Sequence, residues 1–252
     1  MDNHNKSSDS LFPNLKVFDI EECPRLESML PFLSAQELPV LEAINLRSCD
    51  GLKYIFGQFH SMFLYRLNMR EHVQCLPIQS HSIFHIKEIN LSHFSKIKSV
   101  FILSITPKML LDTLTIKNCH ELKNIIIDTD HESGVNNWGD IFPKLQRIYV
   151  EDCKKLEYIF GRGDHNLQSH DEIHLNLPVL KYINLCNLSG LVAMCTKQYR
   201  TTFPPLGELE HNGCSHAAIK SFHDFIIHPS LESLDTIKKV YIPLSILCCL
   251  CN

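Results

Sequence analysis

Apolar residues recur along the chain at a spacing that changes from three to two. In the stretch FPNLKVFDIEECPRLESML, which covers residues 12–30, they stand at Leu15, Phe18, Ile20, Cys23 and Leu26. Phe18 and Ile20 alternate with polar residues, which predicts a short β-strand with one buried face. Cys23 then marks the turn that leaves this strand. We therefore expect a structural unit made of a strand, a turn and a return segment.

The same template recurs down the chain, with starts at Leu15, Leu41, Leu64, Ile86, Leu111, Leu145, Leu180, Leu206 and Leu231. The units starting at Leu64, Leu206 and Leu231 are degenerate. In the Leu206 unit, His211 stands where the template has an aliphatic residue. A single short strand cannot bury its apolar face. Stacked units bury it by pairing their strands into a parallel sheet over one continuous core.

The unit length agrees with a leucine-rich repeat, because six of the eight spacings lie in its window of roughly 20 to 29 residues. Polar insertions at 128–140 and 161–174 account for the two longer spacings and are predicted to be loops. The expected fold is an α/β leucine-rich-repeat horseshoe of about nine coils over residues 11–237, with a parallel β-sheet on the concave face and irregular or briefly helical segments outside. Residues 1–10 are predicted to be a disordered polar N-terminus, and residues 238–252 an apolar tail.

The recurring cysteine is interpreted as a packing position. It occurs once per unit on the side predicted to be buried, whereas a zinc site needs ligands that converge on one point. Phe94 and Leu188 take its place in otherwise sound units. Asparagine usually fills this slot in such repeats, and a thiol can replace it as a small apolar body with a weak S–H donor. The positions concerned are Cys23, Cys49, Cys119, Cys153 and Cys214.

Composition and charge exclude several classes of function. A net charge of -4 gives no electrostatic case for nucleic acid. The start MDNHNKSSDS lacks the basic and apolar segments of a secretory signal, so we expect a cytoplasmic protein, with the nucleus left open, and reduced cysteines. No phosphate loop or nucleophile elbow occurs, which predicts no catalytic residues and no cofactor. His165, His170 and His174 lie in a polar insertion that offers no rigid second shell, so we expect no metal either.

The C-terminal tail has two interpretations. Cys248, Cys249 and Cys251 follow the basic pair Lys238 and Lys239, and CLCN has the shape of a prenylation box with an atypical final Asn, so lipidation would attach the chain to a membrane. The other interpretation, which we favour, is a repeat broken by the chain end that exposes what a further coil would cover.

The repeat phrasing carries a family likeness over about residues 11–235. FPNLKVFDIEECPRLESML, LPVLEAINLRSCDGLKYIF and FPKLQRIYVEDCKKLEYIF resemble the C-terminal leucine-rich repeats of plant coiled-coil, nucleotide-binding disease resistance proteins. The resemblance implies a non-catalytic protein-interaction module that senses effectors and restrains the receptor in the defence response. The implied partners are a pathogen effector, a guarded host protein or a nucleotide-binding domain.

Two other repeat classes are weighed against this resemblance. The first alternative is an F-box-type adaptor that recruits substrates, although residues 1–10 are too short and polar to hold an F-box. The second is an extracellular receptor, which the missing signal and the scarcity of glycine disfavour.

The strand pattern also predicts which side chains face solvent. An acidic first unit is followed by arginines, and tyrosines appear further on. Arginine and tyrosine are enriched among the residues that dominate protein interfaces. The alternative is an ordinary solvated sheet face. The candidate protein-binding residues on the concave face are Arg47, Arg66, Arg70, Lys117, Arg147, Tyr149 and Tyr182.

Overall fold

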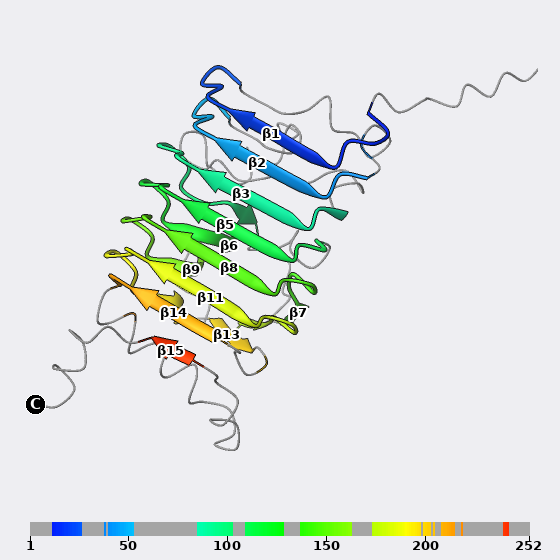
Figure 1. Cartoon of the computed structure of the whole chain (residues 1–252). Coiled ribbons are helices and arrows are strands. Elements are labelled where there is room, and N and C mark those ends of the chain that lie inside the picture. The colour runs from blue at the N-terminus through cyan, green and yellow to red at the C-terminus, as the bar shows by residue number, and fades with distance from the viewer. Residues whose placement is uncertain are drawn as a thin grey trace, which may run out of the picture.

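The computed structural model describes residues 12–26, 38, 40–52, 85–102, 109–128, 137–162, 173–197, 199–202, 204, 208–214, 218 and 239–241. Its ordered elements are β-strands, which pair in parallel to form three sheets (Figure 1). The described repeats lie side by side, and each of them contributes one strand to the largest sheet. The fold is therefore a stack of parallel β coils, as the repeat pattern predicts.

The largest sheet has eight strands, in the order β1, β2, β3, β5, β8, β11, β14 and β15. Their bounds are Val17–Glu21, Ala43–Arg47, Glu88–Ser92, Thr113–Lys117, Arg147–Glu151, Tyr182–Cys186, Glu208–Asn212 and Lys239–Tyr241. Every neighbouring pair keeps one register without a bulge, so Ile44 aligns with Ile89, and Ile89 with Leu114. Equivalent template positions of different repeats thus become neighbours in space.

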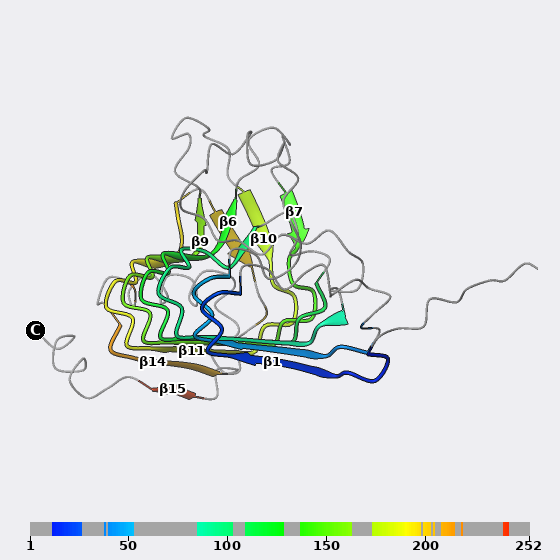
Figure 2. The same ribbon diagram turned by 90° about the horizontal axis from the view of Figure 1, so that it is seen from above.

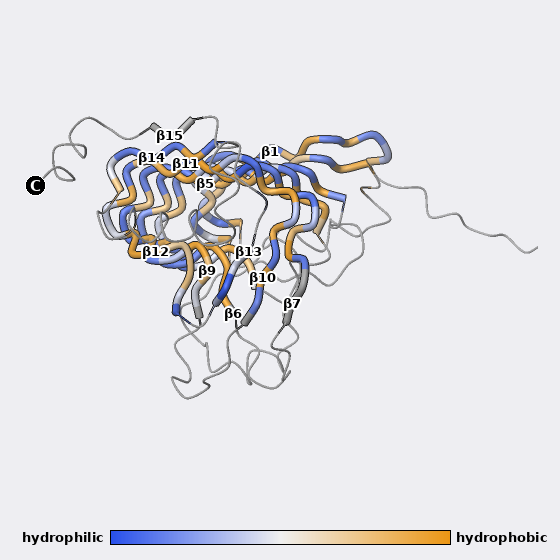
Figure 3. The backbone as a smooth tube through the Cα atoms, turned by 90° about the horizontal axis from the view of Figure 1, so that it is seen from below, coloured by the Kyte–Doolittle hydropathy of each residue, from blue (hydrophilic) through white to orange (hydrophobic). Residues whose placement is uncertain are grey.

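Alternation along each strand separates the core from the solvent. Ile44 and Leu46 in β2 are fully buried, and the residues at the same positions in β3, β5, β8 and β11 are buried as well. The intervening residues of these strands are half-buried or exposed. Figure 3 shows the alternation as short hydrophobic and hydrophilic lengths along the coils. The apolar positions form one continuous cluster, as stacking of the repeats requires.

Two smaller parallel sheets close the other side of the core (Figure 2). One has the order β12, β9, β6, β4, with bounds Ala193–Cys195, Tyr158–Arg162, Asn124–Asp128 and Phe101–Ile102. The other has the order β13, β10, β7, with bounds Tyr199–Thr202, Ile173–Asn176 and Asn137–Asp140. Phe101 and Phe142 meet in the core edge to face, with ring centroids 5.1 Å apart.

The outer segments correct one part of the predicted fold class. We expected irregular or briefly helical returns, but the described returns form strands, so the described part of the chain is mostly parallel β-structure rather than α/β. The reason is local: β6 reads NIIID and β9 reads YIFGR, and runs of β-branched and aromatic residues favour strands over helices. Ile125, Ile126 and Ile127 are all buried in β6.

The insertions are shorter than their polar composition predicts. The expected loop at 128–140 begins with the last residue of β6 and ends with β7, and the expected loop at 161–174 gives its first two residues to β9 and its last two to β10. Both insertions leave their coil between the second and third sheets. The loop boundaries were misplaced because Asn137–Asp140 gains backbone pairing from β10, which a single-strand pattern does not reveal.

Two of the degenerate repeats also differ from expectation. The unit that starts at Leu64 falls outside the described residues, and the sheet has no strand between β2 and β3 because these two pair directly over five residues. The last described strand is Lys239–Tyr241, within the segment predicted as a tail. The template that starts at Leu231 predicts Leu234 and Thr236 as the two buried positions of the strand. In the structure, Val240 is the residue that aligns with Leu209 of β14.

The first strand is less buried than predicted. Phe18 and Ile20 were expected in the core, but both are only half-buried and pack against its edge. β1 ends the described sheet, so among the described strands only β2 pairs with it. The degenerate Leu206 unit, by contrast, forms a complete strand, because His211 occupies the buried position in register with Leu185.

A left-handed residue follows each of the first seven strands of the large sheet and turns the chain inward. These residues, all with positive φ, are Glu22, Ser48, His93, Asn118, Asp152, Asn187 and Gly213. The backbone N–H of Asn118 donates to the carbonyl of Glu151 in the next coil at 2.9 Å, and equivalent bonds join the other coils up to Asn187. Asparagine, aspartate and glycine tolerate this conformation best. The turn therefore continues the ladder between coils beyond the end of the strand.

The recurring thiols stabilise the same turn. Each donates its S–H to the backbone carbonyl two residues earlier: Cys49 to Arg47 at 3.2 Å, and Cys153 to Glu151 at 3.4 Å. Cys119, Cys23 and Cys214 make the equivalent bond. Cys49, Cys119 and Cys153 are fully buried. The interpretation of the cysteine as a packing position with a weak donor agrees with this geometry.

The left-handed turn predicts that valine destabilises the protein more at the turn than in the strand before it. Asn118→Val should lower the free energy of unfolding by about 1–2 kcal/mol, because valine is strained at a φ of 54°. Thr115→Val, in the middle of the neighbouring strand, should change it by less than about 0.5 kcal/mol. Urea denaturation measures both, and an equal response of the two variants would contradict the role of the turn.

The cysteine slot predicts a graded series. Cys153→Ala should cost about 1–2 kcal/mol of unfolding free energy, because it removes the S–H···O bond and leaves a small void in a fully buried site. Cys23→Ala should cost less, since Cys23 is only half-buried at the edge coil. Thermal unfolding followed by circular dichroism compares the two, and a larger loss at Cys23 would refute this assignment.

Candidate protein-recognition face

The outward side chains of the large sheet form one surface, here called the recognition face. It comprises the first, third and fifth residues of β1, β2, β3, β5, β8, β11 and β14. Because the register is unbroken, these residues form three rows that run across the strands. The middle row reads Asp19, Asn45, Asn90, Thr115, Tyr149, Asn184 and Glu210. No residue of the face is fully buried.

Side-chain amides order the N-terminal part of the middle row. Asn90 Nδ2 donates to Asn45 Oδ1 at 2.8 Å, and Asn45 Nδ2 lies 3.5 Å from Asp19 Oδ2. Amides can donate and accept at once, so they link across strands that stand about 4.8 Å apart. The row is therefore held in a fixed orientation on this side of the face.

A second group of contacts orders the C-terminal part and is here called the tyrosine–glutamate cluster. It consists of Tyr149, Tyr182, Asn184 and Glu210. The two tyrosine rings lie 5.0 Å apart, tilted by 42°. Tyr182 Oη donates to Glu210 Oε2 at 2.7 Å, and Asn184 Nδ2 donates to the same oxygen at 2.6 Å. Three adjacent strands thus place two aromatic rings beside one oriented carboxylate.

The phenol of Tyr182 stays protonated over the whole physiological range. Partial burial raises its pKa to about 12, and the negative charge of Glu210 acts in the same direction, while the amide of Asn184 opposes it. A protonated phenol can donate to Glu210, whereas a phenolate would repel it. The cluster therefore keeps the same hydrogen bonds at neutral pH.

The three predicted cations that the structure describes are each paired with an acid of a neighbouring coil. Arg47 lies 2.9 Å from Glu21, Lys117 lies 2.8 Å from Glu151, and Arg147 lies 3.1 Å from Asp112. Surface pairs of this kind contribute little stability, about 0–1 kcal/mol each. Their effect on the face is to cancel charge locally, so the described arginines and lysines do not form a continuous basic patch.

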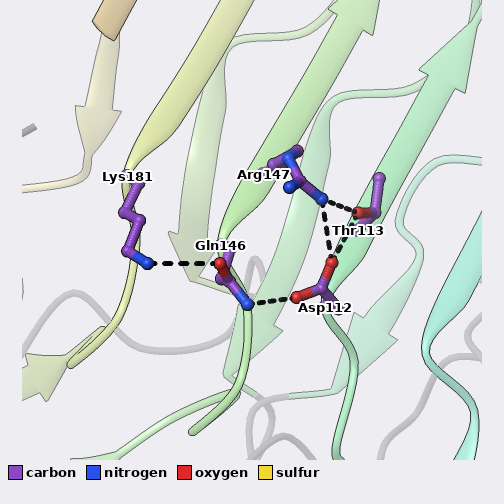
Figure 4. A network of polar contacts seen from close by, with 5 residues as sticks. All are labelled: Asp112, Thr113, Gln146, Arg147 and Lys181. Atoms are coloured by element: carbon purple, nitrogen blue, oxygen red, sulfur yellow. Dashed lines mark hydrogen bonds and ion pairs between the residues drawn. The ribbon is translucent and has the colours of Figure 1, made fainter. Parts of the chain in front are cut away.

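Figure 4 shows the network around Asp112, which lies at the edge of the face. Its carboxylate accepts from Gln146 Nε2 through Oδ1, and from Arg147 and Thr113 through Oδ2. Lys181 reaches Gln146 Oε1 at 3.4 Å, so three successive coils are joined. This network holds Arg147 toward the strand of the preceding coil.

The structure brings only part of the predicted site together. Arg147 and Tyr182 are register neighbours, and Tyr149 contacts Tyr182. Lys117 lies one strand away, at the other end of β5, and Arg47 lies on β2 next to Ser92. Arg66 and Arg70 fall outside the described residues, so their part in binding stays a prediction. The candidate residues chosen from the sequence did not include Asn184 and Glu210, although the strand template places both on the solvent-facing side.

Burial keeps two thiols of the described residues in their protonated form. Burial raises the pKa of the Cys195 thiol to about 12 and that of Cys214 to about 11, so both stay protonated at neutral pH. Within the same residues no group of three or more metal-binding side chains gathers. The histidines of the second insertion lie outside them except for His174, which is exposed. The described part of the chain also contains no helix of the length and apolarity that a membrane span requires.

Comparison with known proteins decides the family. Residues 110–240 match the family model of leucine-rich repeats in plant disease resistance proteins of the RPS2-like type, which is just over half of the chain. The chain belongs to this family. The resistance-protein repeats described here are also 27% identical over 149 residues to a protein of Arabidopsis thaliana named as a putative disease resistance RPP13-like protein 1. No solved structure matches the chain.

The match with this relative covers 59% of the present chain but only 11% of the relative. These resistance-protein repeats therefore correspond to a small part of a much longer protein. The resemblance inferred from the repeat phrasing is confirmed by both comparisons.

The tyrosine–glutamate cluster predicts a cost for removing its amide. Asn184→Ala should lower the free energy of unfolding by about 1 kcal/mol, because a charge-assisted bond to Glu210 is lost at a half-exposed site. Thr115→Ala, in the same row and without a described side-chain partner, is the matched control and should change it by less than about 0.5 kcal/mol. Chemical denaturation measures the difference, and no difference between the variants would contradict the cluster.

Proposed function

We propose that this chain recognises another protein through the recognition face, as the non-catalytic repeat part of a plant immune receptor. One observation carries the proposal: in the described part of the chain, the outward residues of seven adjacent strands are half-buried or exposed. The two smaller sheets lie on the opposite side of the core (Figure 2), so no described element covers this face. A face that the fold leaves uncovered and orders by side-chain contacts is suited to binding.

The chemistry of the face favours a protein as the partner. It combines tyrosines, amides and paired charges, which is the composition of specific and largely polar protein interfaces. A phosphate backbone would require a surplus of cations, and the described arginines and lysines of the face are instead paired with acids. The charged residues of these ion pairs can also pair with charges of a complementary protein surface. Such contacts contribute more to the choice of partner than to the affinity of binding.

The family adds finer elements to this proposal. We infer that the stack curves into a horseshoe with the large sheet on its concave side, and that the chain acts in the cytoplasm. Within a receptor, the face would bind a pathogen effector, a guarded host protein or the receptor's own nucleotide-binding domain. Binding the last of these would restrain the receptor in the resting state. The membership in plant disease resistance repeats supports each of these inferences.

A photo-crosslinker placed on the face tests the proposal. With benzoylphenylalanine at Thr115, the full chain expressed in plant cells should crosslink to a discrete protein. Adding Tyr149→Ala and Tyr182→Ala should abolish the product, because two aromatic contacts of the face are lost. Mass spectrometry of the crosslinked product measures the result.

The matched control places the same crosslinker at Lys154, which is exposed on a turn away from the face. Equal crosslinking from Lys154, or none from Thr115, would contradict the proposal. Changing Arg47, Arg66 and Arg70 together to Glu in the Thr115 variant tests the predicted basic residues separately. An unchanged product would remove those three from the interface.

A further inference from the structure

We propose that the tyrosine–glutamate cluster binds an arginine side chain that projects from the partner protein. The inference rests on the proposed function, because it assigns a partner chemistry to one place on the recognition face. Three features support it: an oriented carboxylate, a local surplus of negative charge and a pair of accessible aromatic rings. Each follows from contacts of the described residues.

The carboxylate of Glu210 is oriented before any partner arrives. Tyr182 and Asn184, both on β11, donate to its Oε2 atom at 2.7 and 2.6 Å. Both bonds use one oxygen, so Oε1 retains its acceptor capacity, and a carboxylate can accept about four hydrogen bonds in all. Fixing a group in its bound geometry lowers the entropy cost of association. Glu210 is therefore prepared to accept a further donor.

The charge of Glu210 is not cancelled by the described cations around it. Arg147 is paired with Asp112, and Lys117 with Glu151. Lys181 reaches toward Gln146, on the side away from β14 (Figure 4). Among the lysines and arginines that the structure describes between residues 12 and 214, none forms an ion pair with Glu210.

The other acid of β14 occupies a different place on the face. Glu208 stands at the register position beside Lys239, whereas Glu210 stands beside Tyr241. Glu210 is the acid that accepts the hydrogen bonds of Tyr182 and Asn184, so it supplies the oriented carboxylate. A complementary partner would bring a positive charge to this point.

The rings of Tyr149 and Tyr182 select among cations. Their centroids lie 5.0 Å apart, and both tyrosines are half-buried, so part of each residue remains exposed to solvent. A guanidinium group is planar, stacks on an aromatic face and presents two parallel N–H donors to a carboxylate. An ammonium group is compact, more strongly hydrated and lacks this planar fork. The combination of rings and carboxylate thus favours arginine over lysine.

A selection of random displayed peptides against the immobilised full chain tests the inference. Peptides that bind wild type and do not bind the Glu210→Gln variant should share one arginine. Replacing this arginine by citrulline, which has the same shape without the charge, should weaken binding about tenfold or more. Replacing it by lysine should weaken binding by a smaller factor. Fluorescence anisotropy of the synthetic peptides measures these changes.

Glu157→Gln is the matched control, because it removes an equal charge from an exposed residue outside the recognition face, directly before β9. It should leave the affinity within about twofold of wild type. The inference is overturned if no peptide separates wild type from Glu210→Gln, if the selected peptides carry no shared arginine, or if citrulline binds equally well. A face crosslink that depends on the two tyrosines but not on Glu210 would sink this inference while the proposed function stands.

Discussion

Unbroken parallel pairing of the repeat strands is the constraint on which the rest of the structure depends. A parallel pair in constant register places equivalent residues of successive coils next to one another. A shift by one residue would send every buried side chain of a strand to the solvent side. The fully buried Ile44, Ile89 and Leu114 therefore hold not only the core but also the order of the outer rows.

The turn after each strand preserves this register. A left-handed residue turns the chain, its N–H bonds to the next coil, and the following thiol caps a carbonyl of its own strand. In this way the recurring thiol provides a hydrogen-bond donor for a backbone carbonyl in a place where water is excluded. The sulfur suits this place because it combines apolar volume with a weak donor.

Much of this arrangement can be predicted from the sequence, because the same strand pattern recurs in several repeats. The period of two at Ile44 and Leu46 predicts both the strand and its buried side, and the repetition predicts parallel stacking. What escaped prediction depends on contacts between coils. The strands of the outer sheets gain their pairing from neighbours, and the half-burial of Phe18 follows from its place at the end of the described sheet.

The candidate site shows the same division. Tyr149 and Tyr182 can be placed on the face from the pattern alone, but their contact with each other and with Glu210 requires the register of three strands. The pairing of Arg147 with Asp112 likewise depends on a residue outside the strand template. The enrichment of arginine and tyrosine at protein interfaces therefore identified single members of the face. Which charged side chains pair with one another, and that Glu210 has no such pair among the described side chains up to residue 214, could be found only in the structure.

The direct pairing of β2 with β3 is where this account departs most from a simple count of repeats, since the sequence places another unit start at Leu64 between them. The most direct measurement is the rate of disulfide formation in the variant Asn45→Cys, Asn90→Cys, mapped by mass spectrometry. Adjacent strands lie about 4.8 Å apart, within the range for a disulfide, whereas an intervening strand would separate them by about 10 Å. The account predicts rapid formation of the Asn45-to-Asn90 crosslink, and its absence under conditions where Asn90→Cys, Thr115→Cys forms one would contradict the register on which the recognition face rests.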